Sequence, residues 1–264
     1  MIDIKKCCVD FYQTDLVRLL FGDSMHPGSL ELTNELAEKI EIVKESKVLD
    51  VACGFGTTAI YIAKNFGCYV TGIDLSEKNV LEAKKISLIE GTSNVTNFKV
   101  SDAENIVDFG DETFDYALSE CSFCLFPDKK KASEEIYRVI RKQGRIGLSD
   151  IVISQQIPQN VKDTLNKFVC ILEAENERQY TKYLETAGFT NIQFYDKKYA
   201  ILKLLDDIKK RIFAVELLSG LGKVKITNVE EDLAKTKSVI REVGEWINSG
   251  MISYALITGD KSNK

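Results

Sequence analysis

The chain of 264 residues contains very little histidine, proline or tryptophan, with one, three and one residue of each. Its single histidine, His26, cannot form a metal site that needs several imidazoles. No run of about 18 apolar residues is present, so a membrane span is not expected. The segment 1–6 has no apolar core of the kind found in signal peptides. Basic residues are not in excess either: the formal net charge is −5, which argues against a nucleic-acid partner.

The seven cysteines are an odd number and do not have the spacing of a disulfide framework. A chain of this length can bury a hydrophobic core without covalent cross-links. We therefore expect reduced thiols and a cytoplasmic protein.

Strand signals alternate with helical periodicity through most of the chain. We expect strands at 47–51, 69–73, 96–100, 114–119, 144–149 and 191–197. We expect helices at 10–22, 29–41, 57–66, 76–90, 129–141 and 178–187. This alternation predicts an α/β fold with a mostly parallel sheet covered by helices on both faces.

Two later segments interrupt the alternation. Residues 159–175 have a helical pattern, and residues 200–247 predict two or more helices broken near Gly220. Residues 251–257 then predict a last strand, which we expect beside the fifth and sixth strands and antiparallel to both. We divide the expected single domain into an N-terminal helical cap (1–43), a core (44–198), a helical insertion (199–250) and the last strand (251–259).

A glycine-containing turn follows the first predicted strand. Gly54 and Gly56 allow a ligand to approach the backbone closely, because neither carries a Cβ. The helix that begins at Thr57 would direct free N–H groups toward the same ligand. On its own this spacing also fits the turn of a dinucleotide-binding fold.

Two acids at strand ends narrow the choice of ligand. Asp74 lies twenty positions after Gly54, where a carboxylate can accept hydrogen bonds from the hydroxyls of a ribose. Asp50 precedes the turn, where it would repel a pyrophosphate but attract the amino group of a methionine moiety. We therefore predict S-adenosylmethionine (SAM) as the cofactor, in preference to the NAD of an oxidoreductase.

The third and fourth strands end in further acids. Asp102 and the backbone N–H of Ala103 can hold the amino edge of an adenine. Glu120 ends the fourth strand and faces the same expected crevice. Together with Asp50 and Asp74, these acids suit a ligand that carries a sulfonium cation.

These segments resemble the class I SAM-dependent methyltransferases, in the branch of small-molecule enzymes that includes the ubiquinone-type and arsenite methyltransferases. The matching segments are 48–56, 70–76, 101–104 and 114–117, and 139–146 is similar to the family's turn before strand five, with Lys-Gln-Gly where the family usually has Pro-Gly-Gly. The resemblance implies a Rossmann-like, seven-stranded sheet whose last strand is antiparallel. It places the methionine at Gly54 and Gly56, the ribose at Asp74, and the adenine at Asp102 and Ala103. The full set that we predict to bind the cofactor is Asp50, Gly54, Gly56, Thr57, Asp74, Leu75, Asp102, Ala103 and Glu120.

Methyl transfer from a sulfonium is an in-line displacement in which the cofactor supplies the reactivity, so few side chains need be catalytic. His26 precedes a helix that could cap the cofactor, which makes it a candidate base or lid residue as well as a candidate structural residue. Tyr12 and Cys121 are the other two candidates for a catalytic role.

The cysteines leave three interpretations open. Cys121, Cys124 and Cys170 occupy positions similar to those of the cysteines in arsenite methyltransferases, and soft thiolates suit a metalloid. No cysteine follows the glycine turn, however, where those enzymes carry one. Alternatively, these cysteines are small buried residues around the pocket. In the third interpretation, Cys121 and Cys124 form a zinc half-site that Cys7-Cys8 completes. Cys53 and Cys68 fit inert packing positions.

The prediction is a SAM-dependent methyltransferase that acts on a small molecule. The alternatives are an arsenite-like or thiol methyltransferase and a SAM-binding module without catalytic activity. We expect the 200–247 segment either to cover the pocket or to form the surface of a homodimer.

Overall fold

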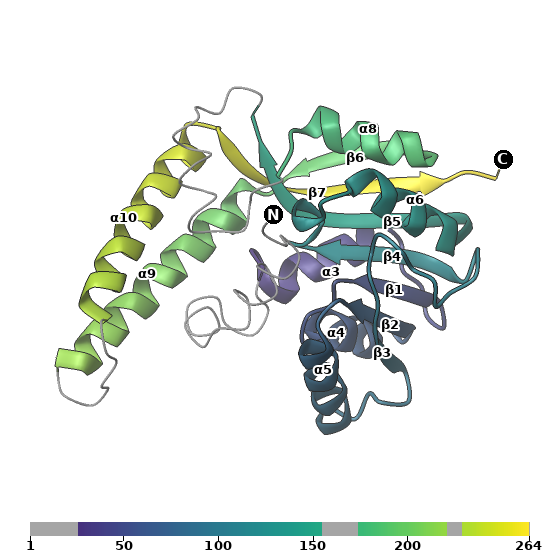
Figure 1. Ribbon diagram of the computed structural model, residues 1–264, viewed down its shortest axis with the longest axis horizontal. Coiled ribbons are helices and arrows are strands. Elements are labelled where there is room, and N and C mark those ends of the chain that lie inside the picture. Colours follow the sequence, from purple (N-terminus) through teal and green to yellow (C-terminus); the bar gives the residue numbers. More distant parts are fainter. Residues whose placement is uncertain (1–25, 155–173, 221–228, 264) are drawn as a thin grey trace.

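The computed structural model describes residues 26–154, 174–220 and 229–263. Their strands form one seven-stranded sheet in the order β3-β2-β1-β4-β5-β7-β6 (Figure 1). The strands are β1 (Lys47–Val51), β2 (Tyr69–Asp74), β3 (Thr96–Val100), β4 (Phe114–Glu120), β5 (Ile140–Ile153), β6 (Phe189–Asp196) and β7 (Ile252–Lys261). The helices are α3 (Ser29–Lys39), α4 (Thr57–Phe66), α5 (Glu77–Ile89), the short 3-10 helix η1 (Phe123–Leu125), α6 (Lys129–Val139), α8 (Glu177–Ala187), α9 (Lys198–Gly220) and α10 (Val229–Asn248).

The strand order reverses at β1, which lies between β2 and β4 and runs parallel to both. In open α/β sheets, ligands bind beyond the carboxyl ends of the strands at such a reversal. The last strand, β7, lies between β5 and β6 and is antiparallel to each of them. The predicted fold class is therefore confirmed, including the position and direction of the last strand.

Two hydrophobic cores cover the two faces of the sheet. One contains buried residues of α3, α4, α5, α9 and α10, among them Leu36, Ile62 and Ile247. The other contains buried residues of α6 and α8, among them Ile136 and Tyr180. Both faces of the central strands are thus apolar, which explains their continuous hydrophobic runs.

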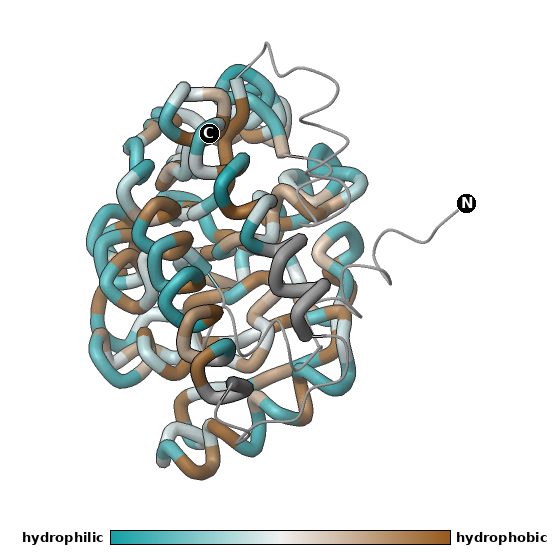
Figure 2. Tube along the Cα trace, turned by 90° about the vertical axis from the view of Figure 1, so that its left-hand side faces the viewer, coloured by the Kyte–Doolittle hydropathy of each residue, from teal (hydrophilic) through white to brown (hydrophobic). Residues whose placement is uncertain are grey.

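Helices α9 and α10 lie side by side and extend away from the sheet (Figure 1). They confirm the two helices predicted within 200–247. Hydrophilic and hydrophobic residues alternate along the coloured part of the tube in Figure 2. Within the described residues, the search for a helix of the length and hydropathy needed to cross a membrane found none.

The start of the fifth strand differs from its prediction. We expected a helix to residue 141 and a strand over 144–149, but α6 ends at Val139 and β5 begins at Ile140. Ile140 already pairs with Phe114, after which the register shifts before Arg145 pairs with Tyr116. Gly144 lies within this irregular stretch, where a Cβ would stand 2.4 Å from the Asp115 carbonyl oxygen. The predicted helix at 10–22 lies outside the described residues, as does the one at 159–175 except for its last two positions. These are not helical, and Glu175 forms a β-bridge with Val152.

Candidate cofactor and acceptor site

The turn after β1 uses its two glycines for different reasons. Both have positive φ, 53° at Gly54 and 77° at Gly56. A Cβ at Gly56 would lie 2.7 Å from the ring of Phe98, so this glycine is required by packing. A Cβ at Gly54 would meet no atom within 4 Å. The backbone at Gly54 therefore borders open space, as expected beside a bound ligand.

Asp50 lies at the end of β1 with 2% of its surface exposed. Burial raises the pKa of its carboxyl well above the usual range, and the charges of Glu120 and Asp74 raise it further. Its Oδ2 atom is buried and has no hydrogen-bond partner among the described residues. A carboxylate with an unused buried oxygen fits a cationic group such as the ammonium of SAM.

Asp74 ends β2 and holds the glycine turn in place. Its carboxylate accepts hydrogen bonds from the backbone N–H of Gly54 at 2.9 Å, the N–H of Ser76 at 2.8 Å and the side chain of Asn79 at 3.2 Å. Burial raises the pKa of this carboxyl, and these three donors oppose the rise. A carboxylate has about four acceptor positions, so little capacity remains for ribose hydroxyls unless one donor is exchanged.

The predicted adenine residues form a tight turn after β3. The Asp102 carboxylate accepts a hydrogen bond from the N–H of Glu104 at 3.0 Å, and Ala103 is buried. Strands β2 and β3 are paired, with Asp74 opposite Val100. Leu75, which is 42% exposed, follows directly after this pair. The structure thus brings Asp74, Leu75 and the Asp102 turn to neighbouring strand ends.

Glu120 forms the centre of a buried polar cluster at the end of β4. Its carboxylate accepts hydrogen bonds from the hydroxyls of Thr33 in α3 at 2.9 Å, Thr58 in α4 at 2.6 Å and Ser149 in β5 at 3.3 Å. The Nε2 atom of His26 lies 3.5 Å from Glu120 Oε2. We call these five residues the Glu120 cluster. The sequence predicted Glu120 and His26 as site residues but gave no indication that they are neighbours.

His26 is buried, with 6% of its surface exposed. Its Nδ1 atom lies 3.2 Å from the carbonyl oxygen of Pro27. Its Nε2 atom has no hydrogen-bond partner among the described residues, because the contact with Glu120 does not have hydrogen-bond geometry. Tyr12, the second candidate for catalysis, lies outside the described residues.

Of the two cysteines near Glu120, Cys124 is buried and Cys121 is half-buried. Cys121 has a φ of 51° and donates its backbone N–H to the Ser149 carbonyl oxygen at 2.7 Å. Burial raises the pKa of both Cys121 and Cys124, and the negative charge of Asp150 adds to the effect. Such surroundings disfavour the thiolate, which is the form of cysteine that acts as a nucleophile or metal ligand. The search for groups of at least three possible metal ligands found none in the described part of the chain.

The other cysteines divide between packing positions and undescribed segments. Cys53 and Cys68 are buried, and burial raises the pKa of each, as expected of packing residues. Cys7-Cys8 and Cys170 lie outside the described residues, so the predicted roles of these residues stay predictions.

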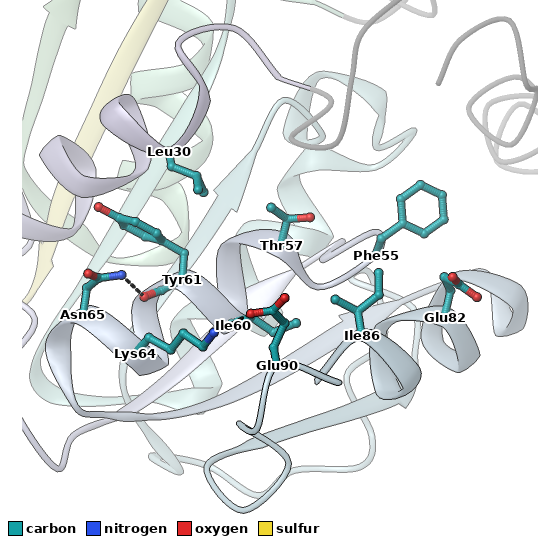
Figure 3. A pocket seen from close by; sticks show the side chains of 10 residues that line it. All are labelled: Leu30, Phe55, Thr57, Ile60, Tyr61, Lys64, Asn65, Glu82, Ile86 and Glu90. Carbon is teal, nitrogen blue, oxygen red and sulfur yellow. Dashed lines mark hydrogen bonds and ion pairs between the residues drawn. The ribbon is translucent and has the colours of Figure 1, made fainter. Parts of the chain in front are cut away.

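A cavity of about 570 Å³ lies beside α4 and α5 (Figure 3). It is lined from α4 by Thr57, Ile60, Tyr61, Lys64 and Asn65, from α5 and its end by Glu82, Ile86 and Glu90, and by Leu30 and Phe55. An ion pair of 2.5 Å joins Lys64 to Glu90 across it. None of the four predicted acids lines this cavity.

Comparisons with known proteins show the family to which the chain belongs. Residues 42–200 match the model of a family described as a methyltransferase domain. The methyltransferase GfsG of Streptomyces halstedii is 27% identical over 96% of this chain and 93% of its own length. The glycine/sarcosine/dimethylglycine N-methyltransferase of Actinopolyspora halophila is 28% identical over 94% of this chain, which spans only 42% of that enzyme.

A solved structure shares the fold. Phosphoethanolamine N-methyltransferase 2 of Haemonchus contortus, in complex with SAM, aligns with a TM-score of 0.84 and 19% identity over all of this chain and 61% of its own.

The fold, the glycine turn and the acids at the strand ends define a class I methyltransferase. This chain belongs to the methyltransferase domain family. Membership of this family confirms three predictions: that the chain is an enzyme, that its cofactor is SAM and that its acceptor is a small molecule.

Proposed function

We propose that the chain holds SAM beyond the ends of β1, β2 and β3 and transfers its methyl group to a small molecule beside the Glu120 cluster. The observation that carries this proposal is that the end of β1 and the turn after it have both a buried acceptor without a partner, Asp50 Oδ2, and open space beside the backbone of Gly54. One is an acceptor for the ammonium of SAM, and the other is room for its methionine chain.

The remaining contacts follow from the order of the strands. In this proposal the turn from Gly54 to Thr57 borders the methionine chain, and Asp74 binds the ribose after exchanging one of its present donors. Leu75, Asp102 and Ala103 border the adenine. The methyl group then lies on the side of β4, near Glu120. When bound, SAM supplies an activated methyl group, and the protein supplies position and electrostatic surroundings.

Calorimetry with SAM and S-adenosylhomocysteine tests this proposal directly. We expect binding of both, with release of part of a proton on binding because a nearby ammonium favours the ionised form of Asp50. Titrations in buffers of different ionisation enthalpy measure that proton. Absence of binding at millimolar ligand would refute the proposal.

A SAM-binding module without activity is the alternative, because the sequence offers few candidate bases. A single-turnover measurement of methyl loss from SAM across an acceptor panel separates the two functions. The raised pKa values of Cys121 and Cys124 disfavour the thiolates that the thiol or metalloid alternative requires.

The setting of the enzyme is part of the same proposal. The net charge of −5 favours a small-molecule acceptor over nucleic acid. The odd number of cysteines favours a location in the reducing cytoplasm. The paired helices α9 and α10 offer a surface for a homodimer, which light scattering coupled to size exclusion would measure.

A further inference from the structure

Two buried polar atoms near the end of β4 lack partners. His26 Nε2 and Asp50 Oδ2 are both buried without a hydrogen-bond partner among the described residues. Both belong to the surroundings of Glu120: Nε2 lies 3.5 Å from its Oε2 atom, and its charge raises the pKa of Asp50. Buried polar groups in native proteins are nearly always satisfied, so two unpartnered ones near one carboxylate point to ligands that complete them.

The contacts of His26 define what its ring can do. The Pro27 carbonyl oxygen, 3.2 Å from Nδ1, can only accept a hydrogen bond. In the neutral ring, the proton therefore belongs on Nδ1, and Nε2 carries a free lone pair. A proton that arrives at Nε2 would be stabilised by the negative charge of Glu120 at 3.5 Å. One nitrogen is thus fixed by an acceptor while the other is ready to take up a proton beside a carboxylate.

The titratable groups around this pair favour one kind of nucleophile. Glu120 from β4 faces His26, and Tyr254 from β7 hydrogen-bonds to Ser149. Asp50 from β1 lies within electrostatic reach of both Glu120 and Asp74 from β2. Forming an oxyanion or thiolate beside these carboxylates would bring like charges together. An amine reacts as a neutral group and becomes a cation, which the same carboxylates stabilise.

We propose that the acceptor is an amine that binds as an ammonium, that His26 Nε2 takes its proton, and that Glu120 is the positioning residue that stabilises the imidazolium. The N–H bond breaks and its proton moves to Nε2, leaving the electron pair on the amine nitrogen. That pair forms the new N–C bond to the methyl group as the C–S bond breaks and its electrons stay on sulfur. The products are the methylated ammonium and S-adenosylhomocysteine, and His26 returns its proton to solvent.

This inference rests on the proposed function, and an acceptor panel tests it separately. The panel pairs benzylamine with benzyl alcohol and benzyl mercaptan, and glycine with glycolate, each incubated with methyl-labelled SAM and read by mass spectrometry. We expect label on nitrogen and none on the matched oxygen or sulfur compounds. Label on oxygen or sulfur, or no methylated amine while calorimetry shows SAM bound, overturns the inference. Loss of SAM binding itself contradicts the proposed function instead.

Two substitutions test the roles of the residues with the amine that is methylated best. We expect His26→Gln to lower kcat by about 100-fold or more near neutral pH with little change in the Kd of SAM. The loss should shrink as the pH rises toward the pKa of the amine, because the free amine needs no base. A loss of equal size at every pH indicates a structural role and overturns the assignment of His26.

Glu120→Gln tests the positioning role, because it preserves the shape of the side chain and removes its charge. We expect kcat to fall by about tenfold and the pH profile of kcat to change, because the negative charge 3.5 Å from His26 Nε2 is lost. Glu120→Asp should restore part of the rate. Glu45→Gln, a matched change in a largely exposed ion pair with Lys44, should leave rate and profile unchanged. A Glu120→Gln enzyme with the wild-type pH profile would overturn the role of Glu120.

Discussion

The turn after β1 and the Glu120 cluster lie at the ends of adjacent strands but are assembled in different ways. The donors to the Asp74 carboxylate all lie within 20 positions of it in the sequence, since they are Gly54, Ser76 and Asn79. The contacts of Glu120 come from α3, α4 and β5, and from His26, which lies 94 positions away along the chain. The cofactor side is therefore specified by a short motif, whereas the acceptor side depends on how distant elements pack.

The two glycines of the turn should separate folding from binding, with the largest effects that we expect. Gly56→Ala places a Cβ 2.7 Å from the Phe98 ring at positive φ, which should destabilise the protein by about 2–5 kcal/mol. Gly54→Ala meets no atom and should cost only about 1–2 kcal/mol, yet its methyl group enters the space proposed for SAM. We expect it to weaken SAM binding by about tenfold to 100-fold.

Urea denaturation and calorimetry measure the two effects. A Gly54→Ala protein that binds SAM as the wild type does would show that the open space beside the turn is not part of the cofactor site.

Asp74→Ala should affect both stability and binding. Two backbone N–H groups and the Asn79 side chain would lose their acceptor, at a cost of about 2–4 kcal/mol. We expect the affinity for SAM to fall by at least tenfold as well. Asn79→Ala is the control, because it removes one donor and leaves the carboxylate. Unchanged SAM affinity in Asp74→Ala, measured on folded protein, would contradict the ribose assignment.

The same contrast explains what the sequence could and could not predict. Strands β1 and β3 and helix α4 have the predicted bounds, because their apolar runs are set off by clear turn signals. The predicted start of β5 was wrong, because Ile140 pairs with Phe114 of β4 before the register shifts. This pairing depends on the neighbouring strand and not on the local sequence of β5. Glycines and acids of the cofactor motif are recognisable locally. The contact between His26 and Glu120 cannot be recognised from the local sequence, since it depends on where α3 packs.

We expect the charge of Asp50 to lower the stability of the protein while it raises the affinity for SAM. Its pKa is raised in the folded protein, so the folded state binds this proton more tightly than the unfolded state does. The contribution of Asp50 to the stability of the ligand-free protein is therefore fully present at pH values below the usual carboxyl pKa, and it is lost as the pH rises through the raised value. We expect Asp50→Asn to be more stable than the wild type at neutral pH by about 1 kcal/mol.

Thermal unfolding at several pH values tests this expectation, with the advantage of Asp50→Asn expected to disappear in acid. The same variant should bind SAM at least tenfold more weakly, because it no longer carries a charge for the ammonium. Equal affinity would separate Asp50 from the cofactor.

The cysteines near β4 should produce the smallest effects and thereby limit the chemistry of the acceptor side. The raised pKa values of Cys121, which is half-buried, and of Cys124, which is buried, disfavour a thiolate at either position. A serine replaces each cysteine with only a small change of volume. We expect the double variant Cys121→Ser/Cys124→Ser to keep the rate of amine methylation within about threefold and to lose less than about 2 kcal/mol of stability. Adding Cys170→Ser should change neither value much. Because a thiolate mechanism requires at least one of these sulfurs, a loss of activity of 100-fold or more in the folded triple variant would return the thiol and metalloid alternatives to first place.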